Sequence, residues 1–183
     1  MDTMSSPKAG AGTMTLLQGL EYARGQIIST LIRSETLRAV LTYPEAEVAE
    51  AKAAATTELT TIDPELAAGL LSKYIFPYHF TPSSDDPQRS YLTFSFREFK
   101  PWKNSHLTGL LHFKAHVHKS LIFTEHYQLR SDHIANILQE LLHHNQELGL
   151  GKLEFLKMNE MTVQPDYSTL SLQYQFWSIR APL

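Results

Sequence analysis

A short amphipathic segment with strand-like patterns on both sides constrains this chain more than any other feature. From Ser131 to His144 the apolar residues recur at the spacing that places them on one face of a helix. The members of this stripe are Ile134, Ile137, Leu138, Leu141 and Leu142. The sequence therefore predicts a helix over 131–144 that packs one face against a larger apolar surface.

Both ends of this helix carry sequence signals. Ser131 stands where an N-cap is expected, and Asp132 suits the positive end of the helix dipole. Gly149 and Gly151 follow the last turn, and glycine readily adopts the left-handed conformation that stops a helix. These are signals of architecture and not of chemistry, so we interpret the helix as scaffold.

The segments around the helix alternate with a period of two, which is typical of half-buried strands. The pattern predicts strands over 91–99, 111–118, 152–163 and 167–177, and the slip near Lys157 predicts a bulge. The residues expected to face the core are Leu92, Phe94, Phe96, Leu111, Phe113, Ala115, Val117, Leu170, Leu172, Tyr174 and Phe176. The predicted fold class is α+β, a mainly antiparallel sheet in β-β-α-β-β order with one packed helix, behind a helical N-terminal region.

The N-terminal third has a different pattern. Residues 1–13 are small and polar, and we expect a flexible arm. A helical pattern begins at Met14, and Gly19 and Gly25 weaken it by roughly 1 kcal/mol each relative to alanine. An interruption is expected at 33–35. A helix with two glycines is expected to gain stability by packing, for example against a neighbouring subunit.

The following stretch supplies further helix signals. Residues 44–59 are rich in alanine and glutamate, which predicts a solvated helix and a loop. Asp63 as N-cap and Pro64 at the first helical position predict a short helix ending near Lys73. An extended aromatic segment follows at 74–80. The predicted organisation is a flexible arm over 1–13, a helical region over 14–73 and an α+β core domain over 74–183.

Composition excludes several function classes. The chain has 183 residues and a net charge of −3, and neither half is basic enough to be a nucleic-acid footprint. Cysteine is absent, which excludes disulfides and thiolate metal sites. No apolar run approaches the roughly 18 residues of a membrane span, and the N-terminus lacks the pattern of a signal peptide. We expect a soluble protein with no membrane partner.

The histidines are the sharpest candidates for chemistry. His112, His116 and His118 alternate with Lys114 on one strand face. Histidines two residues apart on a strand can place two imidazoles on one metal ion. A third ligand and nearby carboxylates are missing, however, so a solvent-facing polar row is the favoured interpretation, and no metal site is predicted.

Two further patterns resemble catalytic motifs without meeting their requirements. Ser131, Asp132 and His133 are consecutive on a helix and point in different directions, so they cannot form a hydrolytic triad. The glycine-rich stretch 149–152 follows a helix and precedes a strand, and Leu153 replaces the hydroxyl that a phosphate loop needs. We therefore expect a protein that is not an enzyme, with no catalytic residue and no cofactor.

Three stretches together carry a family resemblance: KYIFPYHFTP at 73–82, LLHFKAHVHKSLI at 110–122, and the helix with its flanks at 127–155. The motifs within them are Arg130-Ser131-Asp132, Ile134-Ala135 and the Gly149-to-Lys152 turn. The chain resembles small neck proteins of tailed bacteriophages infecting Gram-positive hosts, in the class of tail terminators or tail-completion proteins. The likeness covers about residues 70–177 and leaves out the N-terminal third.

The resemblance implies a virion structural protein. In that class a sheet flanked by helices closes into a homo-oligomeric ring, commonly a hexamer, which terminates the tail and joins it to the head-side connector. The implied partners are further copies of the chain, the connector or adaptor, the tail-tube protein, and genomic DNA that passes through without specific binding. The implied location is the neck of the virion, after assembly in the host cytoplasm. His112, Lys114, His116 and His118 are then interface or lumen candidates.

Alternatives stay open at this point. Within the structural class, a tail-tube, baseplate or other head–tail connector component would show the same motifs. From a different class, a small metal-binding module or enzyme would use the face of His112, His116 and His118. The near-balanced charge favours a ring through which DNA slides, because tight phosphate contacts would hold the DNA.

Overall fold

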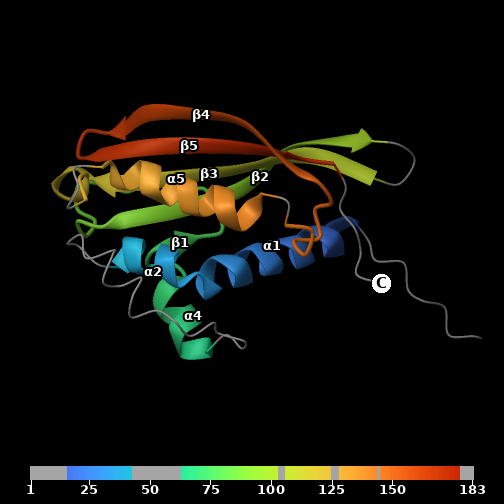
Figure 1. Ribbon diagram of the computed structural model, residues 1–183, viewed down its shortest axis with the longest axis horizontal. Helices are drawn as coiled ribbons and strands as arrows, with labels where there is room; N and C mark the ends of the chain where they lie inside the picture. Colours follow the sequence, from blue (N-terminus) through green and yellow to red (C-terminus); the bar gives the residue numbers. More distant parts are fainter. Residues whose placement is uncertain (1–15, 43–62, 103–105, 125–127, 144, 178–183) are drawn as a thin grey trace, which may run out of the picture.

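The computed structural model describes residues 16–42, 63–102, 106–124, 128–143 and 145–177. They form one five-stranded sheet with helices on one side of it, as Figure 1 shows. The helices are α1 (Leu16–Arg33), α2 (Glu35–Thr42), α4 (Pro64–Leu70) and α5 (Arg130–Leu142). The strands are β1 (Ile75–Phe76), β2 (Ser90–Trp102), β3 (His106–His118), β4 (Leu153–Gln164) and β5 (Tyr167–Phe176). The α+β class is confirmed.

The strand order across the sheet is β1-β2-β3-β5-β4. All neighbours are antiparallel except β1, which pairs in parallel with Leu92 and Thr93 of β2. The register of β4 shifts between Phe155 and Lys157, which confirms the bulge predicted there. A second shift lies in β2 between Arg97 and Lys100, where the far ends of β2 and β3 extend beyond the rest of the sheet (Figure 1).

One hydrophobic core joins the N-terminal helices to the sheet. α5 packs on β3 and β5, and α2 lies between α5 and β2. The predicted stripe of α5 is confirmed, because its apolar residues are buried apart from the half-buried Leu141. The strand residues predicted to face inward also lie in or against this core. The alternating pattern therefore identified the correct face of each central strand.

The start of α5 differs from the sequence expectation. Leu129 is the N-cap, with no side-chain hydrogen bond, and Ser131 is buried within the first turn. The backbone N–H of Arg130 instead donates to the carbonyl of Ile122 at 2.9 Å, so a neighbouring turn of chain satisfies a helix-end donor. The prediction that Ser131 caps the helix is therefore wrong.

The end of α5 also differs. The helix ends at Leu142 with His143 as an extended C-cap, well before the glycines. Gly149 and Gly151 do adopt positive φ values of 71° and 65°, but they shape the turn that leads into β4. The prediction that they stop the helix is wrong, although their left-handed conformation is confirmed.

Arg130 ties two helices together. Its side chain is 1% exposed, and its Nη1 donates to the carbonyl of Val40 in the last turn of α2 at 3.2 Å. Carbonyls of the last helical turn lack intrahelical partners and carry partial negative charge, so a cation stabilises them. Burial lowers the pKa of Arg130. The contact joins segments ninety residues apart in the sequence.

The signals in the N-terminal third are confirmed where the structure describes them. The break falls at Ser34, whose Oγ accepts from the N–H of Leu37 at 3.2 Å and begins α2. Asp63 Oδ1 accepts from the N–H of Glu65 at 3.0 Å and caps α4. α4 ends at Leu70, earlier than predicted. The expected arm over 1–13 and the expected solvated helix and loop over 44–59 lie entirely outside the described residues.

Two glycines should respond oppositely to alanine. A Cβ on Gly25 in α1 would meet nothing within 4 Å, so Gly25→Ala should stabilise the protein by about 1 kcal/mol through helix propensity. A Cβ on Gly109 would lie 2.6 Å from Cζ of Phe176, so Gly109→Ala should destabilise by about 1–3 kcal/mol through overpacking. Urea unfolding of both variants measures the change in the free energy of unfolding. Changes of the same sign in the two variants would contradict the prediction.

Candidate functional site

The face of the sheet opposite the helices is lined by polar and charged side chains, and we call it the polar face. The register of the four long strands brings alternate residues side by side across it. Its members are Thr93, Ser95, Arg97, His112, Lys114, His116, Lys157, Thr169, Ser171 and Gln173. The predicted sharing of one face by His112, Lys114 and His116 is confirmed.

The predicted exposure of this face is wrong for two of its histidines. His112 is 7% exposed, and its Nε2 lies 2.7 Å from Oγ of Ser171. His116 is fully buried, and its Nδ1 lies 2.8 Å from Oγ1 of Thr169. Lys114 is half-buried, with Nζ at 3.3 Å from Nε2 of His79. His118 is also half-buried, and its Nδ1 lies 2.7 Å from Oγ of Ser120.

An aromatic cluster explains this burial. The rings of Phe76 and Phe80 stack with centroids 4.0 Å apart, and both pack on Tyr91 at one end of the polar face. Tyr91 contacts Tyr167, and the hydroxyls of both donate to the carbonyl of Pro87 at 2.7 and 3.1 Å. The chain after β1 therefore covers this end of the face. Local periodicity cannot indicate such a cover, because it comes from a distant part of the sequence.

Burial also sets the charge of the two histidines. Burial lowers the pKa of His116 to about 4, and the neighbouring Lys114 and His79 lower it further. Burial, with Arg97 and Lys114 next, lowers the pKa of His112 to about 4 as well. Both imidazoles are therefore neutral at pH 7, and each has one ring nitrogen that can accept and one that can donate.

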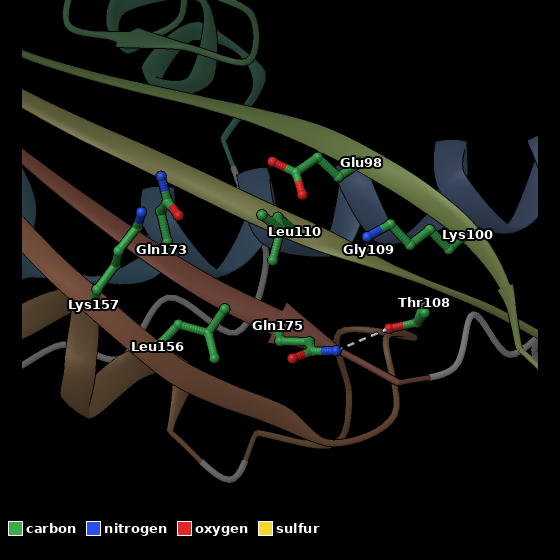
Figure 2. A pocket seen from close by; sticks show the side chains of 9 residues that line it. All are labelled: Glu98, Lys100, Thr108, Gly109, Leu110, Leu156, Lys157, Gln173 and Gln175. Atoms are coloured by element: carbon green, nitrogen blue, oxygen red, sulfur yellow. Dashed lines mark hydrogen bonds between the residues drawn. The ribbon is translucent and has the colours of Figure 1, made fainter.

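The other end of the polar face is hollow. A cavity of about 400 Å³ lies there, between the bulged parts of β2 and β4. Figure 2 shows the side chains that line it. Its lining residues are Glu98, Lys100, Thr108, Gly109, Leu110, Leu156, Lys157, Gln173 and Gln175. Nε2 of Gln175 donates to Oγ1 of Thr108 at 3.4 Å. Glu98 has a φ of 52°, a left-handed value that an L-residue adopts at some cost in strain.

Sequence reasoning missed this cavity. Glu98 and Pro101 interrupt the alternation of β2, so the predicted strand stopped at residue 99 and the extension to Trp102 was not foreseen. The bulge predicted at Lys157 was a usable signal, because bulges turn side chains toward new positions. From the sequence alone, however, the bulge indicates an irregularity of one strand and not part of a site.

The two outer edges of the sheet are largely unpaired among the described residues. β4 pairs with β5 on one side alone, and β1 covers β2 at Leu92 and Thr93 alone. Five large apolar side chains of β4 are at least 39% exposed: Phe155, Leu156, Met158, Met161 and Val163. Natural proteins usually protect edge strands with charges, bulges or a covering element, since bare edges pair with other chains. An exposed apolar edge therefore indicates an interaction surface.

Metal-ligating side chains are not gathered in the part of the chain that the structure describes. No three His, Cys, Asp or Glu residues there are placed to hold a metal ion. None of the described helices has the length and apolar character needed to cross a membrane.

Comparison with known proteins gives one family. Residues 34–176, most of the chain, match the family described as YomW. No curated protein and no solved structure matches the chain. YomW itself is a protein of the SPbeta phage region of Bacillus. The chain therefore belongs to the YomW family and is a phage-related protein.

Proposed function

We propose that this protein is a structural component of the phage neck, a ring that terminates the tail and joins it to the head-side connector. The single observation that carries the proposal is a sheet with two largely unpaired edges, one of them apolar and exposed. Membership of a phage-associated family supports it. In this role the chain is not an enzyme, and its working residues are contacts.

The directions of the strands suit a closed ring. β2, β3, β5 and β4 follow one another in antiparallel pairs, so β4 runs antiparallel to β2. A second copy that placed its β2 beside β4 would continue the antiparallel ladder without interruption. This contact joins two different patches, and a repeated contact of that kind closes a ring when the rotation fits.

The regular parts of the two edges fix where the contact lies. Among the described residues, β4 is regular between its two register shifts, from Lys157 to Met161. β2 is regular and free of β1 from Phe94 to Arg97. A ladder of four or so residue pairs fits these stretches, and Met158 and Met161 supply apolar area on the two faces of the joint.

The ring assigns a direction to each face of the sheet. The helices cover one face, which we place outside, and the polar face then lines the lumen (Figure 1). Lys114 and His118 remain lumen candidates, because they are only half-buried. His112 and His116 lie beneath that surface and support it through Ser171 and Thr169. The head-side connector and the tail-tube protein are the proposed partners at the two ends of the ring.

A tail-tube component is the second candidate. The ends of β2 and β3 extend beyond the rest of the sheet in Figure 1, and a subunit of a stacked tube would use such a projection to reach the next ring. Negative-stain images of the purified protein separate the two candidates. Discrete rings support the neck protein, and extending tubes support the tube component.

Met158→Glu tests the proposed contact. A charge at this half-exposed edge position should prevent strand pairing between copies and leave the fold intact, so rings should become monomers. Light scattering behind a sizing column measures the mass, and circular dichroism checks the fold. Phe123→Glu is the matched control, because Phe123 is 59% exposed and lies outside both edges. If Met158→Glu still forms rings, the proposed edge contact is wrong.

A further inference from the structure

Cationic side chains gather on the polar face from three different strands. Arg97 and Lys100 come from β2, Lys114 from β3 and Lys157 from β4. Lys100 and Lys157 line the same cavity, in which Figure 2 shows both side chains. Arg97, Lys114 and Lys157 all lie close enough to His112 to act on its charge. The four therefore form one cluster, which we call the basic cluster.

The basic cluster has little internal compensation. The salt bridges among the described residues, Arg38–Glu35 and Lys152–Glu154, involve none of its members. Lys114 makes its side-chain hydrogen bond to another basic group, His79. Glu98 is the acidic residue of the cavity lining. Uncompensated charges of one sign repel one another, and an anion bound among them removes that repulsion.

The spread of the cluster indicates the size of the anion. Neighbouring strands lie about 4.8 Å apart, so β2 and β4, three spacings apart in the sheet, are separated by roughly 14 Å. A face of this width is larger than a single small anion. Gln173 and Gln175 of β5 line the same cavity (Figure 2), and their amide groups are further hydrogen-bond donors there. The arrangement suits an extended polyanion.

The chemistry of the face distinguishes a nucleic acid from an acidic protein. Protein-binding surfaces have a core enriched in aromatic residues and depleted in lysine, whereas the cavity lining has no aromatic residue and two lysines. Lysine, arginine and glutamine donors suit phosphate oxygens. Single strands are held mainly by stacking on aromatic rings, which this lining lacks. The ligand chemistry that remains is a duplex held by its phosphates.

We propose that the polar face binds the phosphate backbone of duplex nucleic acid through the basic cluster, without reading base sequence. The inference deepens the proposed function and rests on it for the position of this face around a lumen. The net charge of −3 does not reveal this cluster, because the charge of the whole chain does not show that these cations lie together on one face. Four phosphate contacts give a dissociation constant on the order of 10⁻⁴–10⁻⁶ M at physiological salt, which still allows DNA to slide.

Fluorescence anisotropy of a labelled duplex with the full chain tests the inference. The logarithm of the association constant should fall with the logarithm of salt with a slope of about −3 to −4 for four contacts. Lys100→Glu, which lies outside the proposed ring contact, should weaken binding by about tenfold or more and reduce the slope by about one. Glu98→Gln should tighten binding severalfold, because it removes the acidic residue of the cavity.

Arg33→Glu is the matched control, since it makes the same type of charge change at an exposed end of α1 in the helical layer. Equal weakening by Arg33→Glu and Lys100→Glu would overturn the assignment of the face. Poly-glutamate serves as the competitor that represents an acidic protein. If it displaces the duplex at an equal concentration of negative charges, the ligand is an acidic protein and the assignment to nucleic acid is overturned. Light scattering on the same samples distinguishes this inference from the proposed ring. If the protein forms rings that do not bind the duplex, only this inference is overturned. If monomers bind the duplex, only the proposed ring is overturned.

Discussion

Phe113→Ala should lower the free energy of unfolding by about 3–5 kcal/mol, because it removes a fully buried ring from the centre of the sheet. Phe113 lies on β3, with the ring of Phe94 at 5.6 Å on the neighbouring strand and that of Tyr174 at 6.0 Å on the other. Both contacts are lost together with the burial of the ring, and the rigid strands around the site limit its collapse. Urea unfolding followed by circular dichroism measures the change.

Phe123→Ala provides the comparison for this prediction. Its ring is 59% exposed, so the same substitution should change stability by no more than about 0.5 kcal/mol. Phe113→Leu, which keeps most of the volume, should fall between the two. If Phe113→Ala and Phe123→Ala cost the same, then the position of the core described above is incorrect.

Acidification should destabilise the protein between pH 6.5 and pH 4. The pKa of His116 is about 4 in the folded protein against 6.5 for a solvated histidine, so in this interval the unfolded chain binds a proton that the folded chain does not. The unfolding free energy therefore rises with pH across the interval, by about 3 kcal/mol from His116. Above pH 6.5 this contribution is complete and stays constant.

The physical cause of this effect is the cover over the polar face. Nε2 of His116 is buried without a hydrogen-bond partner among the described side chains, and a proton there would place a charge near Lys114 and His79. His112 should act in the same direction, because burial and the nearby cations lower its pKa too.

Substitution of the two histidines isolates their part of the pH dependence. His116→Gln keeps a polar contact for Thr169 and removes the titration, so the difference in stability between pH 7 and pH 4.5 should shrink. The double variant with His112→Gln should shrink it further. Chemical unfolding at a series of pH values measures this difference. An unchanged difference in the double variant would show that carboxylates alone set the acid sensitivity.

The sequence predicted the elements whose signal is local. The stripe of α5, the alternation around Phe113 and the cap at Asp63 each depend on residues a few positions apart, and all three are confirmed. The bulge near Lys157 was visible for the same reason. The fold class followed from the order of these patterns.

The features that sequence reasoning missed depend on contacts between distant segments. His112 and His116 are buried because the chain near Phe80 covers them. The alternation along β3 shows which face of the sheet these histidines lie on, but it does not show that another segment covers that face. Ser131 looked like a cap because its type is right, whereas the carbonyl of Ile122 fulfils part of that role. The basic cluster needed the register of four strands, which a single sequence does not provide.

The shared core has a consequence for how the chain is made. Apolar residues of α1 and α2, such as Ile27, Leu31 and Leu37, pack in a core completed by α5 and the last strand. At roughly 5–20 residues per second, the roughly 125 residues between α2 and β5 take on the order of ten seconds to synthesise. For that time the nascent helices expose their apolar faces on the ribosome, so chaperones have their greatest access to this protein before its final hairpin emerges.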